Sequence, residues 1–265
     1  NNHYWFDTRP NLRREMEERK KRFKDKEDLY PVIRKRVQES FAGGVFGGIH
    51  VFTDSLDVPD DWRLRLVVLA PDAGYSKSGP SRAIAKATEI LKSRGEQPRQ
   101  KQNRLIYLAA DQDNVSRLKD QVRTLLAWES IVNDYKDNRI TLDNLMAKNA
   151  SASFEQAREA LKRMIRETYK WLLAPVQTAV PGRGLSEIQW EPFPVNAGAA
   201  NLSQEIERVL KENELLITEW APYHLANVLK RWFWKDDVKE VGALDVWQKS
   251  GCYLYLPRLR DDTVF

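Results

Sequence analysis

Two glycine-rich segments have the residue types that bind phosphate. Gly74–Ser81 combines glycine, serine and lysine ahead of a predicted helix, but a Walker A loop places its lysine after the last glycine. Here Lys77 precedes that glycine, and Pro80 removes one of the backbone amides that would hold phosphate. Residues 43–48 precede their strand, whereas phosphate loops follow theirs. We favour a surface turn for Gly74–Ser81, with an anion site as the alternative, and predict no nucleotide site within this chain.

Acidic residues follow two predicted strands. Leu105–Asp111 ends in an acid, as a Walker B strand does, although a central strand whose Asp111 caps the next helix is the interpretation that we favour. Asp72, Asp111 and Asp113 could approach one another and hold a metal, as in a nuclease. No Glu-x-Lys pattern follows on a strand, and the single Cys252 with three scattered histidines gives no zinc pattern. The sequence therefore assigns no catalytic residue and no metal ligand.

Basic residues are concentrated in two places. Residues 9–36 contain 12 Lys/Arg and 6 Asp/Glu, an excess of +6 against +5 for the whole chain, and a second cluster surrounds Gly95 and Pro98. Such clusters can contact nucleic-acid phosphates. The alternative is a solvated helix face, because glutamates alternate with the arginines at pairing distance. The candidate phosphate contacts are Lys20, Lys21, Arg22, Lys92, Arg99, Lys101 and Arg104. Four to six of them would give a slope of log affinity against log salt of roughly −4 to −5.

Tryptophans are interleaved with basic residues near the end of the chain. Four of the nine tryptophans and five basic residues are involved: Trp220, Trp232, Trp234 and Trp247, with His224, Lys230, Arg231, Lys235 and Lys249. This combination can stack nucleobases and bind phosphates. A core role is the interpretation that we favour, because tryptophan is a large buried anchor in small helical modules.

The spacing of apolar residues predicts an α/β fold. Leu64–Leu69 and Arg104–Ala109 are continuous apolar runs typical of buried central strands, and Ile49–Thr53 is a shorter strand. Helical spacing follows over Ser81–Leu91 and again from 115 to 131. Strands that alternate with helices favour parallel pairing through right-handed crossovers. We therefore expect a small parallel or mixed sheet covered by helices, in which the last two strands are parallel neighbours or one strand apart.

Three parts are expected along the chain: a basic helical segment (1–37), an α/β subdomain (38–135) and a mainly helical subdomain (140–265). In the last part, the spacing predicts helices over Leu142–Asn149 and over Ser153–Leu173, the second ended by Pro175.

Further along, Ile188–Phe193 is a candidate strand. A helix, a short extended piece, two helices and an extended Tyr253–Leu259 then follow in the order of a winged helix.

Three stretches occur in a familiar order: Tyr4–Arg14 (YWFDTRPNLRR), Asn103–Asp111 (NRLIYLAAD) with Leu125–Ile131 (LLAWESI), and Tyr253–Leu259 (YLYLPRL). Together they resemble a family of large bacterial P-loop ATPases of otherwise unknown function. Members are encoded beside DNA methyltransferases and helicases in restriction-like and phage-defence gene clusters, and are similar to the ATP-binding protein of BREX systems.

The resemblance implies that an AAA-type core, with ATP and magnesium, precedes Asn1. We also expect both ends of this chain to be cut, because it has no initiator Met and its final residues, Tyr253–Phe265, are still apolar. The expected partners are DNA bound without sequence specificity, the ATPase core of the same chain, and the methyltransferase or helicase of the same gene cluster. In the intact protein, Arg9, Arg13 or Arg14 could sense a γ-phosphate, as arginines do in phosphoryl transfer. The alternative for these arginines is a helix start with a packing role. No cofactor is expected in this fragment, and no ATP hydrolysis.

Three functional hypotheses follow. The first is a non-catalytic accessory region of a defence-associated ATPase that engages DNA or docks DNA-processing partners. The second is a protein-interaction scaffold without DNA contact, and the third is a metal-dependent nuclease. We expect a cytoplasmic location, because one cysteine fits a reducing compartment, and no membrane contact, because the longest apolar run, Leu66–Ala70, is far too short to span a bilayer.

Overall fold

The structure is a computed structural model that describes residues 11–180 and 182–265. It divides into two compact units. The first contains the described part of residues 1–36 together with residues 114–168, and the second contains residues 37–113 and 169–265. Among the described residues, no helix has the combination of length and apolar character needed to cross a membrane.

The first unit is helical. Its elements are α1 (Leu12–Lys20), a π-helical turn (Asp25–Leu29), most of α2 (Tyr30–Gln38), most of α4 (Gln112–Lys136) and α5 (Asn144–Thr168). Met16 of α1 packs with Ile131 of α4 and Ala150 of α5 in one apolar cluster. The Gln121 side chain also donates to the carbonyl of Ala157, 3.0 Å away, which links α4 to α5.

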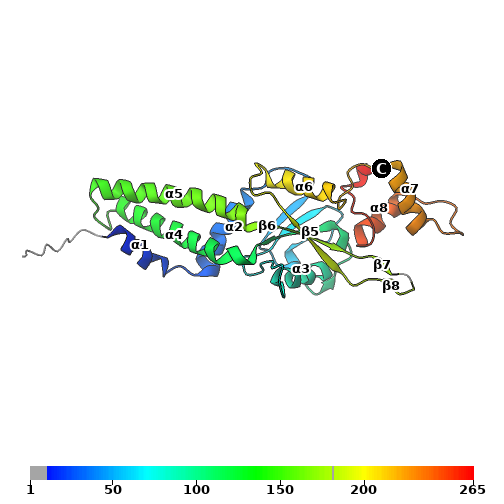
Figure 1. Cartoon of the computed structure of the whole chain (residues 1–265), viewed down its shortest axis with the longest axis horizontal. Coiled ribbons are helices and arrows are strands. Elements are labelled where there is room, and N and C mark those ends of the chain that lie inside the picture. Colours follow the sequence, from blue (N-terminus) through cyan, green and yellow to red (C-terminus); the bar gives the residue numbers. More distant parts are fainter. Residues whose placement is uncertain (1–10, 181) are drawn as a thin grey trace, which may run out of the picture. The chain divides into compact units, whose positions relative to one another are not determined.

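The second unit is built on a five-stranded sheet in the order β1-β2-β5-β6-β9 (Figure 1). The strands are β1 (Gly48–Val51), β2 (Arg65–Val68), β5 (Leu105–Ala110), β6 (Tyr169–Val176) and β9 (Gln189–Pro194). Adjacent strands β1, β2 and β5 are parallel, and β6 and β9 add antiparallel pairs. The predicted α/β class is confirmed, as are the common sheet for the three predicted strands and the parallel pairing of the last two, β2 and β5.

Helices cover both faces of this sheet. One face packs Val67, Tyr107 and Leu173 against Ala87 and Ile90 of α3 (Arg82–Lys92). Figure 1 shows α6 (Leu202–Glu212) on the opposite side of the sheet from α3. All six residues of β5 are buried, as a continuous apolar run requires when a strand is covered on both sides.

Two helix predictions after residue 140 are wrong. The segments expected as separate helices form the single helix α5, because no glycine or proline interrupts residues 149–153. That helix ends at Thr168 and Tyr169 begins β6, which is a strand up to Val176 rather than a helix ended by Pro175. Periodicity alone cannot separate a short apolar run in a buried strand from one in a buried helix. The candidate strand at Ile188–Phe193 is confirmed as β9.

The remaining elements form the end of the second unit. They are α7 (Pro222–Val228), a π-helical turn (Leu229–Phe233) and α8 (Ala243–Cys252). Val228, Phe233, Val246 and Leu256 form their apolar cluster. Residues 253–265, all of them described, contain turns and one bridge between Leu259 and Ile217 rather than a β-hairpin. The winged-helix arrangement is therefore not confirmed. Two short hairpins, β3 (Ser93–Arg94) with β4 (Gln97–Pro98) and β7 (Ala179–Val180) with β8 (Gly184–Leu185), complete the fold.

Candidate nucleic-acid interface

The nucleotide-sensing candidates lie at the start of the chain. Arg9 falls outside the described residues, and Arg13 and Arg14 are exposed on α1. The backbone amide of Arg14 donates to the Asn11 side chain at 3.1 Å, which caps this helix. In the described structure these two arginines therefore occupy an ordinary, solvated helix start.

The basic residues at the end of α1 are largely paired with acids of the same unit. Lys20 lies 2.9 Å from a carboxylate oxygen of Asp120, and Lys21 lies 3.0 Å from one of Glu18. Arg22 is exposed. A phosphate would have to replace existing ion pairs at both lysines, which weakens the argument for DNA contact on this helix.

Arg99 is buried, which excludes it as a surface phosphate contact. Its guanidinium donates to the carbonyls of Ile90 at 2.8 Å, Pro59 at 2.9 Å and Val58 at 3.0 Å. The arginine therefore fastens the loop that follows β1 to α3. Burial lowers its pKa.

Arg104 is excluded for the same reason. It is only 1% exposed and donates to the carbonyls of Leu259 at 2.7 Å and Arg260 at 3.1 Å. Burial lowers its pKa to about 10. From the second basic cluster, the exposed Lys92 and the partly buried Lys101 remain, and the ammonium of Lys101 lies 5.0 Å from the centre of the Trp62 ring. A composition-based count cannot distinguish a structural arginine from a surface one.

The acidic candidates do not assemble into a metal centre. Asp111 accepts from the Trp171 indole at 3.2 Å and lies 3.3 Å from the Lys170 ammonium. Across the described residues, no group of three or more His, Cys, Asp or Glu side chains is placed to hold a metal ion. Gly74–Ser81 begins with a parallel bridge from the buried Tyr75 to Asp111 and continues in an exposed bend at residues 77–79. The hydroxyl of Ser81 then caps α3 by accepting from the amide of Ile84 at 3.4 Å.

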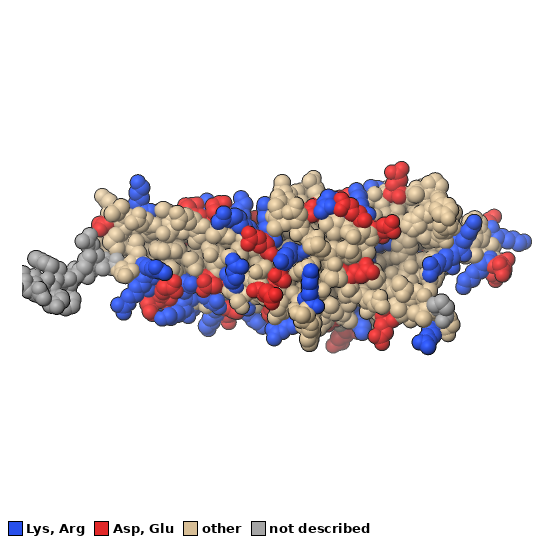
Figure 2. Space-filling model, in the orientation of Figure 1, with Lys and Arg blue, Asp and Glu red and all other residues tan. Residues whose placement is uncertain are grey.

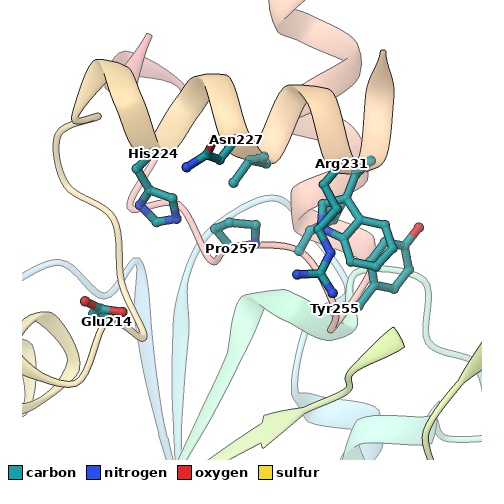
Figure 3. A pocket seen from close by; sticks show the side chains of 9 residues that line it. Glu214, His224, Asn227, Arg231, Tyr255 and Pro257 are labelled. Carbon is teal, nitrogen blue, oxygen red and sulfur yellow. The ribbon is translucent and has the colours of Figure 1, made fainter. Parts of the chain in front are cut away.

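A pocket of about 350 Å³ lies at the end of the second unit (Figure 3). We call it the aromatic pocket. Its lining comes from four segments of sequence: Glu214 after α6, residues of α7, two residues of the following π-helical turn, and the segment after α8. In Figure 3, the side chains of His224, Asn227 and Arg231 extend from one helical segment toward Pro257, and Glu214 faces them from the opposite side. The complete lining is Glu214, His224, Asn227, Val228, Arg231, Trp232, Tyr255, Leu256 and Pro257.

Aromatic rings form one wall of the aromatic pocket and continue beyond it. The Trp232 and Tyr255 ring centres are 4.7 Å apart, and those of Tyr255 and Tyr253 are 5.4 Å apart with an interplanar angle of 24°. Tyr253, at the open end of this row, is 47% exposed. On the other side, the Arg231 guanidinium lies 5.0 Å from the centre of the Trp232 ring. A flat ligand can therefore contact both an aromatic face and a cation here.

Buried hydrogen bonds hold the segment that carries the two tyrosines. The Asn103 side chain, 1% exposed, donates to the carbonyls of Ser250 at 2.8 Å and Leu256 at 3.0 Å. Arg258 donates to the carbonyls of Asn103 and Leu215, both at 3.1 Å, and burial lowers its pKa to about 9. The 3₁₀ turn Gln102–Arg104, immediately before β5, thus fixes the position of Tyr255, Leu256 and Pro257 relative to the sheet.

The charge around the aromatic pocket is mixed. Between residues 229 and 241 there are four exposed cations and three exposed acids, a net charge of +1. Figure 2 shows basic side chains at this end of the second unit, with acidic ones among them. The cations are Lys230, Arg231, Lys235 and Lys239, and none of them forms an ion pair with another described residue.

The comparisons with known proteins give no match: no family model fits the sequence, and none of the curated proteins or solved structures is similar to it. The functional interpretation of this chain therefore depends on the geometry of the aromatic pocket. The interleaved tryptophans and basic residues indicated this region from sequence, and Trp232 and Arg231 do line the pocket. Tyr253 and Tyr255 were missed, because their segment was expected to be the extended wing of a winged helix.

Proposed function

We propose that this chain is a non-catalytic accessory region that engages nucleic acid through the aromatic pocket. In the setting that the family resemblance suggests, the ligand is DNA and the parent protein is a defence-associated ATPase. The observation that carries the proposal is the row Trp232–Tyr255–Tyr253 with Arg231 at one end and an exposed ring at the other. Proteins that bind single-stranded nucleic acid without a strong sequence preference commonly stack bases on aromatic side chains and contact the phosphates with nearby cations.

The stacking energy available at the aromatic pocket favours this site over the basic clusters predicted from sequence, most of whose side chains are buried or paired. Stacking on an aromatic side chain contributes about 1–3 kcal/mol per base. Two of the seven original phosphate candidates, Arg99 and Arg104, are buried, and Lys20 and Lys21 are paired. A duplex held by the seven original candidates would need contacts that the described structure uses internally.

Protein docking is the second candidate function, and a specific observation supports it. Tyr223 is 81% exposed and Leu244 66% exposed, both near the aromatic pocket in sequence. Exposed aromatic residues are enriched at protein interfaces as well as at nucleic-acid sites. The two candidates differ in one measurable property: only nucleic-acid binding depends on salt through released counterions.

Fluorescence anisotropy tests the proposal with labelled single strands and duplexes of about 12 nucleotides. We expect saturable binding at about 50 mM salt. Four phosphate contacts at about −0.7 each allow a slope of log affinity against log salt no steeper than about −3 for a single strand.

Two charge variants make the test specific to the pocket. The double substitution Arg231→Gln with Lys235→Gln should flatten that slope by about 1.4. The matched control is Lys20→Gln with Lys21→Gln on α1, where both lysines are paired with acids, and it should leave the slope unchanged. Absence of saturable binding to any nucleic acid at about 50 mM salt would exclude the proposed function and leave protein docking.

A further inference from the structure

We infer that the aromatic pocket receives an unpaired nucleobase, so that the chain binds single-stranded in preference to duplex nucleic acid. This inference rests on the proposed function and adds the class of ligand to it. It is drawn from three features of the site: the shape of the pocket, the arrangement of its rings and its charge.

The shape of the pocket requires a group that can enter it. Polar side chains of Glu214, His224, Asn227 and Arg231 lie around a recess of about 350 Å³. In Figure 3, Glu214 lies across the recess from His224 and Asn227, which extend from one helical segment. A carboxylate, an imidazole and an amide can accept from and donate to the edges of a base. In a duplex those edges are paired and stacked, so a base must be unpaired before it can reach them.

The arrangement of the rings provides a continuation of base stacking. Tyr253 and Tyr255 are nearly parallel, at 24°, whereas Trp232 is tilted by 45° from Tyr255. Successive bases of a strand can stack on aromatic side chains of this kind. Tyr253 is exposed at the end of the row, so a neighbouring base can stack there while another occupies the pocket. The base pairs of an intact duplex are already stacked on both faces and have no free face to offer.

The charge argues in the same direction. Affinity for duplex DNA depends mainly on neutralised phosphates, and the segment from 229 to 241 has a net charge of only +1. Inside the pocket itself, the negative charge of Glu214 offsets the positive charge of Arg231. A nearly neutral lining suits the neutral, hydrogen-bonding base of a nucleotide. The exposed Lys230, Lys235 and Lys239 remain available for the phosphates of the same strand.

The experiment compares three ligands of equal length by anisotropy on the full 265-residue chain: a single strand, the matching duplex, and a single strand with abasic sites, which keeps the phosphates and removes the bases. We expect the single strand to bind at least about tenfold more tightly than the other two. Tyr253→Ala should weaken single-strand binding by about fivefold or more, because one stacking contact is lost.

Two further variants locate the effect and guard against misfolding. Asn227→Ala should weaken binding of the normal strand and leave the abasic strand unchanged. Tyr223→Ala removes an exposed tyrosine of the same helix that does not line the pocket, so it serves as the matched control and should change neither. Because Tyr253, Asn227 and Tyr223 are all exposed, these substitutions should leave the far-ultraviolet circular dichroism spectrum unaltered.

The possible outcomes separate the unpaired-base inference from the proposed function. Equal or tighter binding of the duplex or of the abasic strand would overturn the unpaired-base inference while supporting nucleic-acid binding. Equal losses in Tyr253→Ala and Tyr223→Ala would place the contact outside the pocket and also overturn the inference. No binding of any of the three ligands would overturn the inference together with the proposed function.

Discussion

Replacing Asn103 by alanine tests whether the aromatic pocket is held in place by the sheet. The Asn103 side chain is 1% exposed, and its amide donates to the carbonyls of Ser250 at 2.8 Å and Leu256 at 3.0 Å. Alanine leaves both carbonyls without these donors in a buried environment. Each unmade bond to a buried neutral group costs about 1–3 kcal/mol, and partial relaxation reduces the sum. We therefore expect the free energy of unfolding of the second unit to fall by about 2–4 kcal/mol.

The assay is urea denaturation followed separately by tryptophan fluorescence and by circular dichroism. Two probes are needed, because a chain with two compact units need not unfold in a single step. Hydrogen exchange of the amides from 250 to 260 should accelerate in Asn103→Ala before any global unfolding, since this segment loses its anchor. Single-strand affinity should fall as well, because Leu256 lines the pocket.

A matched substitution separates this effect from the loss of an asparagine in general. Asn213 is exposed and its side chain donates to the carbonyl of Val209 at 2.8 Å, so Asn213→Ala should change stability by less than about 0.5 kcal/mol. A loss in Asn103→Ala no larger than that of Asn213→Ala, with unchanged exchange from 250 to 260, would refute the conclusion that the turn before β5 positions the pocket.

Two more predictions concern pH and backbone strain. The pKa of His50 is lowered by burial and by Arg65, whose guanidinium nitrogen lies 3.0 Å from the ring. The unfolded chain therefore binds the proton more readily than the folded chain, so the free energy of unfolding should fall as pH drops through about 6.5. Thermal melts should show a smaller fall in His50→Gln than in the unsubstituted protein. An equal fall in both proteins would contradict this. Glu214 has a φ of +57°, a conformation that costs a non-glycine residue about 1–2 kcal/mol, so Glu214→Gly should raise the free energy of unfolding by about 0.5–1 kcal/mol after the greater chain entropy of glycine is subtracted. A destabilised Glu214→Gly in urea denaturation would show that the carboxylate contributes more than the strain costs.

The sequence was sufficient to predict the parallel strands of the sheet but not its antiparallel strand β6. Leu64–Leu69 and Arg104–Ala109 are apolar runs with a helix between them, and they form the adjacent parallel strands β2 and β5. Tyr169–Val176 is also an apolar run, but it directly follows a helix of 25 residues. No local signal separates the end of that helix from the beginning of β6, since the strand is specified by its neighbours β5 and β9 rather than by its own periodicity.

The basic cluster around Gly95 and Pro98 shows what sequence composition cannot indicate about the candidate site. Arg99 and Arg104 lie in a basic cluster, yet their guanidinium groups donate to backbone carbonyls inside the second unit. Arginine is suited to this, because its planar group has five donors and can satisfy several carbonyls at once. Lys92, one of the lysines of the same cluster, is exposed. Arg94 of the same cluster is exposed as well, so neither the type of basic residue nor the local density of charge indicates from sequence alone which side chain is buried.

The aromatic pocket connects these two observations. Its wall contains Tyr255, Leu256 and Pro257, which follow α8 and have no regular secondary structure. Such a segment can hold a fixed shape only if its backbone carbonyls find donors elsewhere. Arg104 supplies them to Leu259 and Arg260, and Asn103 supplies one to Leu256. Arg104, predicted from sequence as a DNA-phosphate contact, therefore supports the site together with Asn103, and the binding surface consists of the aromatic rings that they hold in position.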